Sequence, residues 1–167
     1  TCKYNQKKLM GLCGITVDEI EIDTFLTNSR NVKSEEIDPT LNKLKRTISS
    51  INDVNQKELI LSLKLENSLK KLQKDGSYNA FALRCWPEMF TEYGGAICAP
   101  ASMLTEKKVP CACEADVYGA VTQLILQEVS GQPVFLTDIV DINIDDDTGV
   151  FWHCGQAPLS MCNPKIK

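Results

Sequence analysis

Apolar positions recur every three or four residues through two long stretches of the chain. In residues 34–51 this spacing predicts a helix with Leu41, Leu44, Ile48 and Ile51 on one face. A proline at position 39 is acceptable there only near the start of the helix, because it has no N–H to donate.

A longer helix is predicted from the capping signal Asp53–Gln56 to the stop at Asp75–Gly76. Its apolar face consists of leucines and should lie in the core: Leu59, Leu63, Leu65, Leu69 and Leu72. Its hydrated face should consist of lysines: Lys57, Lys64, Lys70 and Lys71.

Shorter apolar runs predict strands at residues 15–22, 79–85, 109–113 and 134–142. Helices are expected between the last three: one ends near Lys107–Lys108, and one covers residues 115–129. The second of these should bury one apolar side, made of Val117, Val121, Leu124, Ile125 and Val129. A turn at residues 145–149 should let residues 150–154 pair back as an antiparallel hairpin.

This alternation predicts an α/β fold, a mostly parallel sheet flanked by helices in a Rossmann-like three-layer arrangement, with a C-terminal antiparallel hairpin. We divide the chain into an α/β domain at 1–130 and a hairpin unit at 131–167. Ligands of such folds bind beyond the carboxyl ends of the strands. Glu88, Glu114 and Asp138 lie at or near that edge.

The composition of the chain argues against several classes of function. A net charge of −4, without a basic stripe, argues against a nucleic-acid surface. No apolar run approaches the roughly 20 residues of a membrane span. Eight cysteines without a secretion signal indicate reduced core residues of a cytoplasmic protein. There is no Cys-x-x-Cys pair and a single histidine, which argues against structural zinc. Because the chain begins with Thr1, we expect that an upstream part is missing.

Two carboxylates define the candidate chemistry. Glu114 and Asp138 end apolar runs on either side of one helix-sized segment, and a buried acid is costly unless it is paired or metal-bound. With His153, they favour a hard divalent ion such as Mn²⁺ or Mg²⁺ and a polyol-like substrate. Such an ion acidifies a sugar C–H, and the carboxylates can move the proton between two carbons.

Each candidate also has a plainer interpretation. Glu114 can serve as a helix N-cap or first-turn acid, and Asp116 fits that role better. A lone histidine such as His153 is more often a core or surface residue than a ligand. Trp152 is either a core residue or a platform for a sugar ring.

Four segments carry these residues: Cys85–Glu88, Pro110–Ala120, Phe135–Ile142 and Gly149–Gly155. Together they resemble the L-fucose/L-arabinose isomerase family. Upstream, Gly11–Val17 and Ile20–Asp23 resemble the start of that family's second domain.

The resemblance implies a divalent-metal aldose–ketose isomerase, usually with Mn²⁺, that works through an enediol. It implies that Glu114 and Asp138 are both the metal ligands and the acid/base pair. Aspartate at the second position resembles the fucose-type branch. It also implies sugar contacts and a cytoplasmic homo-oligomer without nucleic-acid or membrane partners; the expected substrate-binding residues are Trp86, Glu88, Trp152 and His153.

The chain departs from the family in extent. It resembles only the middle domain (1–130) and the start of the C-terminal domain (131–167), without the late histidine that completes the metal shell. We therefore expect a fragment of an isomerase that is inactive alone. Two other classes stay open: a noncatalytic sugar-binding or regulatory module of the same fold, and a redox or thiol-dependent protein built around the cysteines.

Overall fold

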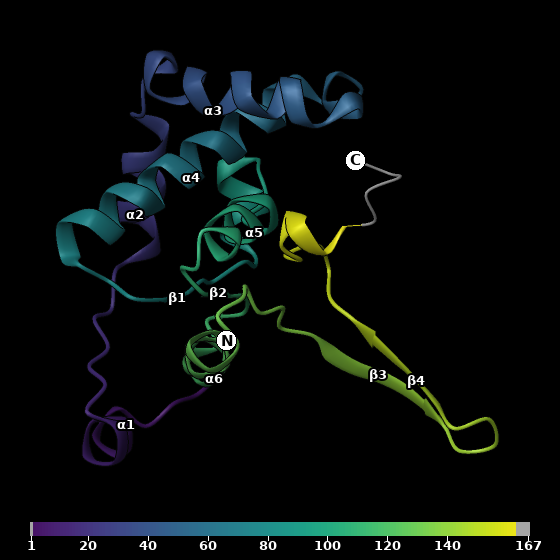
Figure 1. The fold of residues 1–167 in the computed structure, drawn as a ribbon. Coiled ribbons are helices and arrows are strands. Elements are labelled where there is room, and N and C mark those ends of the chain that lie inside the picture. Colours follow the sequence, from purple (N-terminus) through teal and green to yellow (C-terminus); the bar gives the residue numbers. More distant parts are fainter. Residues whose placement is uncertain (1, 163–167) are drawn as a thin grey trace.

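The computed structural model describes residues 2–162 (Figure 1). The helices are α1 (Gln6–Cys13), α2 (Ile22–Arg30), α3 (Ser34–Thr47), η1 (Ser49–Asn52), α4 (Gln56–Gly76), η2 (Met89–Tyr93), α5 (Cys98–Glu106), α6 (Val117–Ser130) and η3 (Leu159–Met161). The strands are β1 (Phe81–Ala82), β2 (Cys111–Ala112), β3 (Asp138–Asn143) and β4 (Thr148–Trp152).

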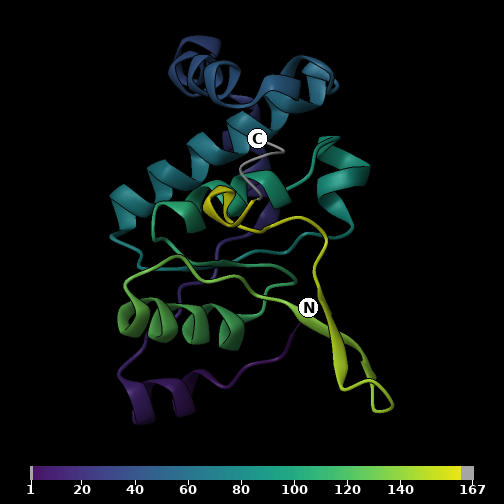
Figure 2. The ribbon, with the colours of Figure 1, turned by 45° about the vertical axis from the view of Figure 1, so that its right-hand side comes forward.

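Strands β1 and β2 form a parallel pair, in which Phe81 lies opposite Cys111 and Ala82 opposite Ala112. Helices α2 to α5 lie on one side of this pair, and α1 and α6 lie on the other (Figures 1 and 2). The predicted α/β class is confirmed in this form. The parallel sheet has two strands within residues 2–162, so a large parallel sheet is not shown.

The N-cap of the longest helix, α4, lies two residues later than the predicted capping residue Asp53. The side chain of Asn55, not Asp53, accepts hydrogen bonds from the backbone N–H groups of Lys57 and Glu58. The helix ends at Ser77, whose φ of 53° is left-handed. Its predicted leucine face is confirmed, because Leu63, Leu65 and Leu69 are buried.

Two apolar clusters form the core on the α4 side of the sheet. The larger joins α2, α4, α5 and β2, and its members include Phe25, Leu26, Leu65, Leu69, Met89, Ile97, Leu104 and Cys111. The smaller joins α3 to α4 and contains Val32, Ile37 and Leu63. No helix of residues 2–162 has both the length and the apolar character that crossing a bilayer requires.

The predicted strand at Ile15–Ile22 is wrong. Residues 15–21 belong to no strand or helix, and Ile22 begins α2. A cleft of about 710 Å³ lies between this segment, β1 and α6. β-Branched composition describes a fit to a half-buried surface rather than a pairing partner, which is why the pattern misled here.

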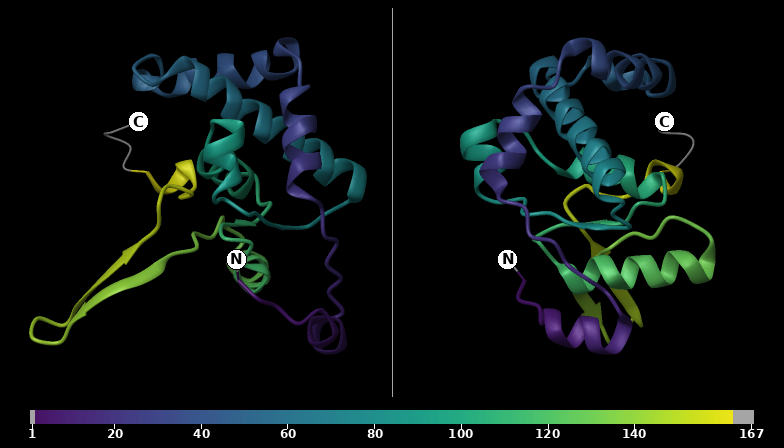
Figure 3. Two further views of the ribbon diagram at one scale, coloured as in Figure 1. Left: turned by 180° about the vertical axis from the view of Figure 1, so that it is seen from behind. Right: turned by 90° about the vertical axis from the view of Figure 1, so that its left-hand side faces the viewer.

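Strands β3 and β4 form the predicted antiparallel hairpin, and a register irregularity lies between Ile139 and Asp141. The first strand begins at Asp138, four residues later than predicted. The hairpin projects from the rest of the molecule (Figure 3), and every residue of both strands is exposed. Large apolar side chains, among them Ile142, Phe151 and Trp152, are therefore in contact with solvent.

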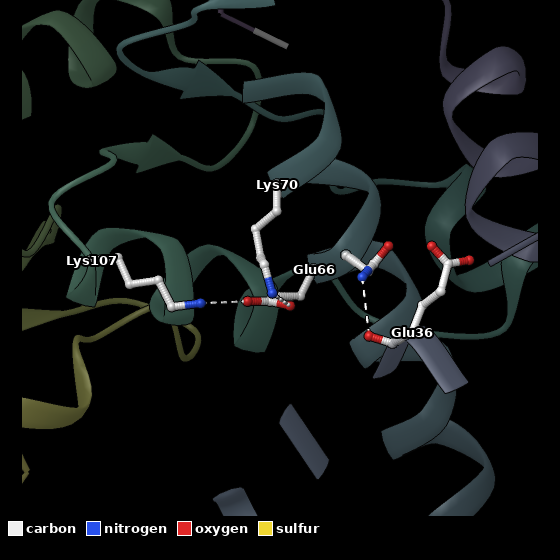
Figure 4. Close-up of polar contacts among 5 residues, drawn as sticks. Glu36, Glu66, Lys70 and Lys107 are labelled. Atoms are coloured by element: carbon white, nitrogen blue, oxygen red, sulfur yellow. Dashed lines mark hydrogen bonds and ion pairs between the residues drawn. The ribbon is translucent and has the colours of Figure 1, made fainter. Parts of the chain in front are cut away.

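A buried carboxylate links α4 to α5. Glu66 is 1 % exposed, and its two oxygens lie 2.7 Å from Lys107 Nζ and 3.3 Å from Lys70 Nζ (Figure 4). On the same helix, Asn67 donates to the carbonyl of Glu36 in α3 at 3.3 Å. Because a carboxylate out of water needs partners, the two lysines make the burial of Glu66 tolerable.

Removing one of these partners should destabilise the fold. We expect Lys107→Met to lower the free energy of unfolding by about 2 kcal/mol, since it leaves the buried charge of Glu66 with one weaker partner. Urea denaturation measures this change. Lys74→Met, an exposed α4 site, is the matched control and should change stability by less than about 0.5 kcal/mol; equal effects would contradict the assignment.

Candidate functional site

Glu114 occupies a tight turn between β2 and α6. Glu114 and Ala115 both have left-handed backbones, with φ of 59° and 54°. The Ala115 N–H donates to the carbonyl of Leu83 at 2.8 Å, and the Asp116 N–H donates to the carbonyl of Cys113 at 3.0 Å. These bonds fix the turn at the carboxyl end of β2 and leave the Glu114 side chain exposed.

Asp116 is the N-cap of α6. Its Oδ1 accepts a hydrogen bond from the Gly119 N–H at 2.9 Å, so the capping role predicted for Asp116 is confirmed. A Cβ at Gly119 would lie 2.4 Å from Asp116 Oδ2, which explains the glycine at this position. The N-cap interpretation of Glu114 is wrong, because Glu114 lies two residues before the cap.

The segment after α6 brings Asp138 back toward the start of this helix. Gln123 donates from Nε2 to the carbonyl of Val134 at 2.9 Å. A Cβ on Gly119 would lie 3.1 Å from Leu136 Cδ2, so Leu136 packs over the first turn of α6. Figure 2 shows this segment running back along α6 before β3 begins. Asp138 follows Leu136 by two residues and is exposed.

The expected apolar side of α6 is wrong in part. Val117 is buried as predicted, but Val129 is 81 % exposed and Ile125 is also exposed. Buried glutamines take the place of these residues: Gln127 donates to the carbonyl of Lys108 at 3.1 Å, and Gln123 holds the return segment. These amides satisfy backbone groups that a valine could not.

Glu88 is held by an ion pair. Its Oε1 lies 2.6 Å from Arg84 Nη2, while its Oε2 is buried without a hydrogen-bond partner. Trp86 is exposed, and its ring centroid lies 5.7 Å from that of Phe90. Arg84 was not among the predicted site residues, although it follows β1 as Glu114 follows β2.

His153 and Trp152 end the hairpin. His153 is half-buried; its Nε2 lies 3.3 Å from Gln156 Nε2, and its Nδ1 is buried without a partner. Trp152 is 59 % exposed, so its interpretation as a core residue is wrong in residues 2–162. None of the six predicted site residues lines the large cleft beside residues 15–21.

The acids offer only part of a metal shell. Across residues 2–162, no group of three or more histidine, cysteine, aspartate or glutamate side chains is arranged to hold a metal ion. Glu114 and Asp138 are hard oxygen donors of the kind that Mn²⁺ or Mg²⁺ prefers. Two such donors do not complete a coordination sphere.

The cysteines divide into three groups by exposure, of which Cys85 and Cys98 form the half-buried one. Cys111 and Cys113 are buried as predicted, and burial raises the pKa of both thiols. The prediction that the cysteines are core residues is wrong for four exposed positions: Cys2, Cys13, Cys154 and Cys162. Their strand-like surroundings suggested burial, but Cys154 follows the projecting hairpin.

Comparison with known proteins points to sugar chemistry. The chain is 27% identical over 161 residues to sulfoquinovose isomerase of Priestia aryabhattai, an alignment that covers 96% of this chain and 36% of the relative. It is 28% identical over 154 residues to sulfoquinovose isomerase of Clostridium sp. (strain MSTE9), with 92% of this chain and 34% of the relative covered. The chain is similar to sugar isomerases.

A third relative, sulfoquinovose isomerase of Alkalicoccus urumqiensis, is 28% identical over 155 residues, covering 92% of this chain and 35% of the relative. The chain therefore spans about a third of the length of the relatives that it matches. No family model matches, and no solved structure matches. The expected sugar-isomerase relationship is supported, but the L-fucose branch specifically is not shown.

The capping role of Asp116 gives a stability prediction. Asp116→Ala should lower the free energy of unfolding by about 1 kcal/mol, because the Gly119 N–H loses its acceptor. Asp116→Asn keeps an acceptor and should remain near the parent value. Thermal denaturation of the two variants separates these outcomes; equal losses would contradict a capping role.

Proposed function

We propose that this chain is part of an aldose–ketose isomerase and carries two of its catalytic carboxylates, Glu114 and Asp138. The similarity to sulfoquinovose isomerases supports the reaction class. The chain itself would be a fragment of a longer enzyme, in line with the third of the relatives' length that it spans. A cytoplasmic homo-oligomer belongs to the same proposal.

The main support for the proposal is the path of the chain around α6. Glu114 lies in the turn just before the helix, and Leu136 packs on its first turn, two residues before Asp138. Both acids are thereby supported at the same end of α6. Both are also exposed, as groups that meet a substrate must be.

Two such carboxylates suit the proton transfer of an aldose–ketose isomerisation. One carboxylate removes the proton from the carbon beside the carbonyl while a carboxylic acid protonates the carbonyl oxygen, which gives an enediol. A proton then returns to the former carbonyl carbon while the hydroxyl of the neighbouring carbon gives up its proton and becomes the new carbonyl. The pair therefore needs one member ionised and one protonated as the reaction proceeds.

A divalent cation, Mn²⁺ in this proposal, would be held by the same two carboxylates and a further ligand from outside residues 2–162. Such an ion supplies polarisation of the sugar carbonyl when bound. The incomplete donor set of this chain agrees with a site that needs another segment. Exposed Trp152 and half-buried His153 would contact the sugar.

The substrate is proposed to be a free aldose. Sulfoquinovose, from the name of the relatives, is the first candidate, and L-fucose is the second. Asp138 is the only residue behind the fucose-type expectation.

A noncatalytic sugar-binding module of the same fold is the second candidate. The absence of a three-donor group in residues 2–162 favours it over a complete active site in this chain. The two candidates differ in turnover. An isomerase converts the sugar and loses this activity when a carboxylate is removed, whereas a noncatalytic module binds the sugar without converting it.

Substitution of the acids tests the catalytic proposal. In the protein that carries this chain, Glu114→Gln and Asp138→Asn should each reduce the rate of aldose isomerisation by about 10²- to 10⁴-fold, because each removes an acid/base group of similar shape. Sulfoquinovose and L-fucose are assayed in parallel.

Matched controls lie close by in the sequence. Glu128→Gln on α6 and Asp141→Asn on β3 change exposed acids that have no proposed role, and both should retain the parent rate. Unchanged rates in the Glu114 and Asp138 variants would refute their assignment. A parent without turnover on any aldose, but with sugar binding, would favour the noncatalytic module.

Metal binding by the chain alone gives a further prediction. Two carboxylates without a third ligand should bind Mn²⁺ with a Kd no tighter than about 10⁻⁴ M, at the weak end of oxygen-ligand sites. Isothermal titration calorimetry measures this constant, and Glu114→Gln should weaken it further. A micromolar Kd for Mn²⁺ that is the same in Glu114→Gln would show that the ion binds at another site.

A further inference from the structure

The segment that follows the hairpin is fastened along α5. Ser102 donates from Oγ to the carbonyl of Ala157 at 2.6 Å. Ser160 donates its N–H and its hydroxyl to Glu106 Oε2, both at 2.9 Å. Ser102 and Glu106 are four residues apart and share one face of the helix with Cys98, four residues earlier.

Cys98 lies beside the start of the segment that follows the hairpin. A Cβ on Gly155 would lie 3.8 Å from Cys98 Cβ, so the backbone next to Cys154 lies against the Cys98 side chain. Cys154 is exposed and Cys98 is half-buried. Burial first, and then the neighbouring thiol of Cys154, raises the pKa of Cys98 to about 11. The fold therefore brings together two cysteines that are separated by 56 positions in the sequence.

We propose that Cys98 and Cys154 are a thiol modification site: they form a reversible disulfide that ties the base of the β3–β4 hairpin to α5. The oxidant is a small-molecule disulfide such as oxidised glutathione. This inference goes beyond the proposed isomerase function and does not depend on it.

One molecule of the small disulfide accepts both electrons of this oxidation. The exposed Cys154, as its thiolate, attacks the small disulfide, whose S–S bond breaks and releases one small thiol. Cys98 then loses its proton and attacks the Cys154 sulfur of the mixed disulfide, which releases the second small thiol. Two protein thiols are oxidised by two electrons, and the reagent is reduced to two thiols that take up both protons.

Geometry favours this pair over the other neighbouring thiols. Cys113 is buried, so a small disulfide cannot reach it. Cys154 is the exposed member of the group and therefore reacts first. The new bond would follow directly on Trp152 and His153 and would hold the end of β4 against the body.

Disulfide mapping of the full chain tests the proposal. The reduced protein is incubated with oxidised glutathione, free thiols are alkylated, and the product is digested for mass spectrometry. A glutamate-specific protease separates Cys85 from Cys98 by cutting after Glu88 and Glu92, and chymotrypsin separates Cys154 from Cys162 by cutting after Leu159. We expect one cross-link, between the peptides of Cys98 and Cys154.

Oxidation should also raise Tm by about 5–10 °C, since the bond closes a long loop of the unfolded chain, and dithiothreitol should reverse the shift. Cys98→Ser should stop at a stable glutathione adduct on Cys154, and Cys154→Ser should abolish both the cross-link and the Tm shift. Cys13→Ser, an exposed control, should behave as the parent. A cross-link between other cysteines, a persistent adduct on Cys154 of the parent, or no reaction at Cys98 and Cys154 would overturn the proposal.

Discussion

The backbone hydrogen bonds between β1 and β2 are the constraint on which the position of Glu114 depends. Phe81 donates its N–H to the carbonyl of Pro110 and Leu83 donates to the carbonyl of Ala112, each at 2.8 Å. Because the two strands run parallel, the residues that follow them emerge at one edge of the sheet. The positions of Glu114 and of the thiols of Cys111 and Cys113 therefore depend on this short pairing rather than on an extensive sheet.

Helix α6 and the segment that follows it determine the position of the second acid, Asp138. Its start is fixed by the Asp116 cap, and its buried Gln123 binds the carbonyl of Val134 in the returning segment. The chain must leave and return within one helix length, so Asp138 comes back to the end at which Glu114 sits. The hairpin that starts there has exposed apolar side chains on both strands and is positioned at its base by contacts with α5.

The sequence predicted the parts of the fold in which local chemistry and packing agree. The leucine spacing of α4 marks its buried face, and the Asp116 cap and the hairpin follow from short-range rules. It failed where a partner decides the outcome: residues 15–21 have strand composition but no strand to pair with, and Val129 is apolar yet faces solvent. Spacing indicated Glu114 and Asp138, and the pairing of Arg84 with Glu88 spans only four residues. The approach of Cys98 to the segment that begins at Cys154 joins positions that no local pattern connects.

The most direct test of the account is a crystal structure of the longer protein that carries this chain, grown with Mn²⁺ and located by the anomalous scattering of manganese. The account predicts one ion bound by carboxylate oxygens of both Glu114 and Asp138, beside the first turn of α6. An ion bound by other residues, or side chains of Glu114 and Asp138 turned to opposite sides of α6, would contradict it.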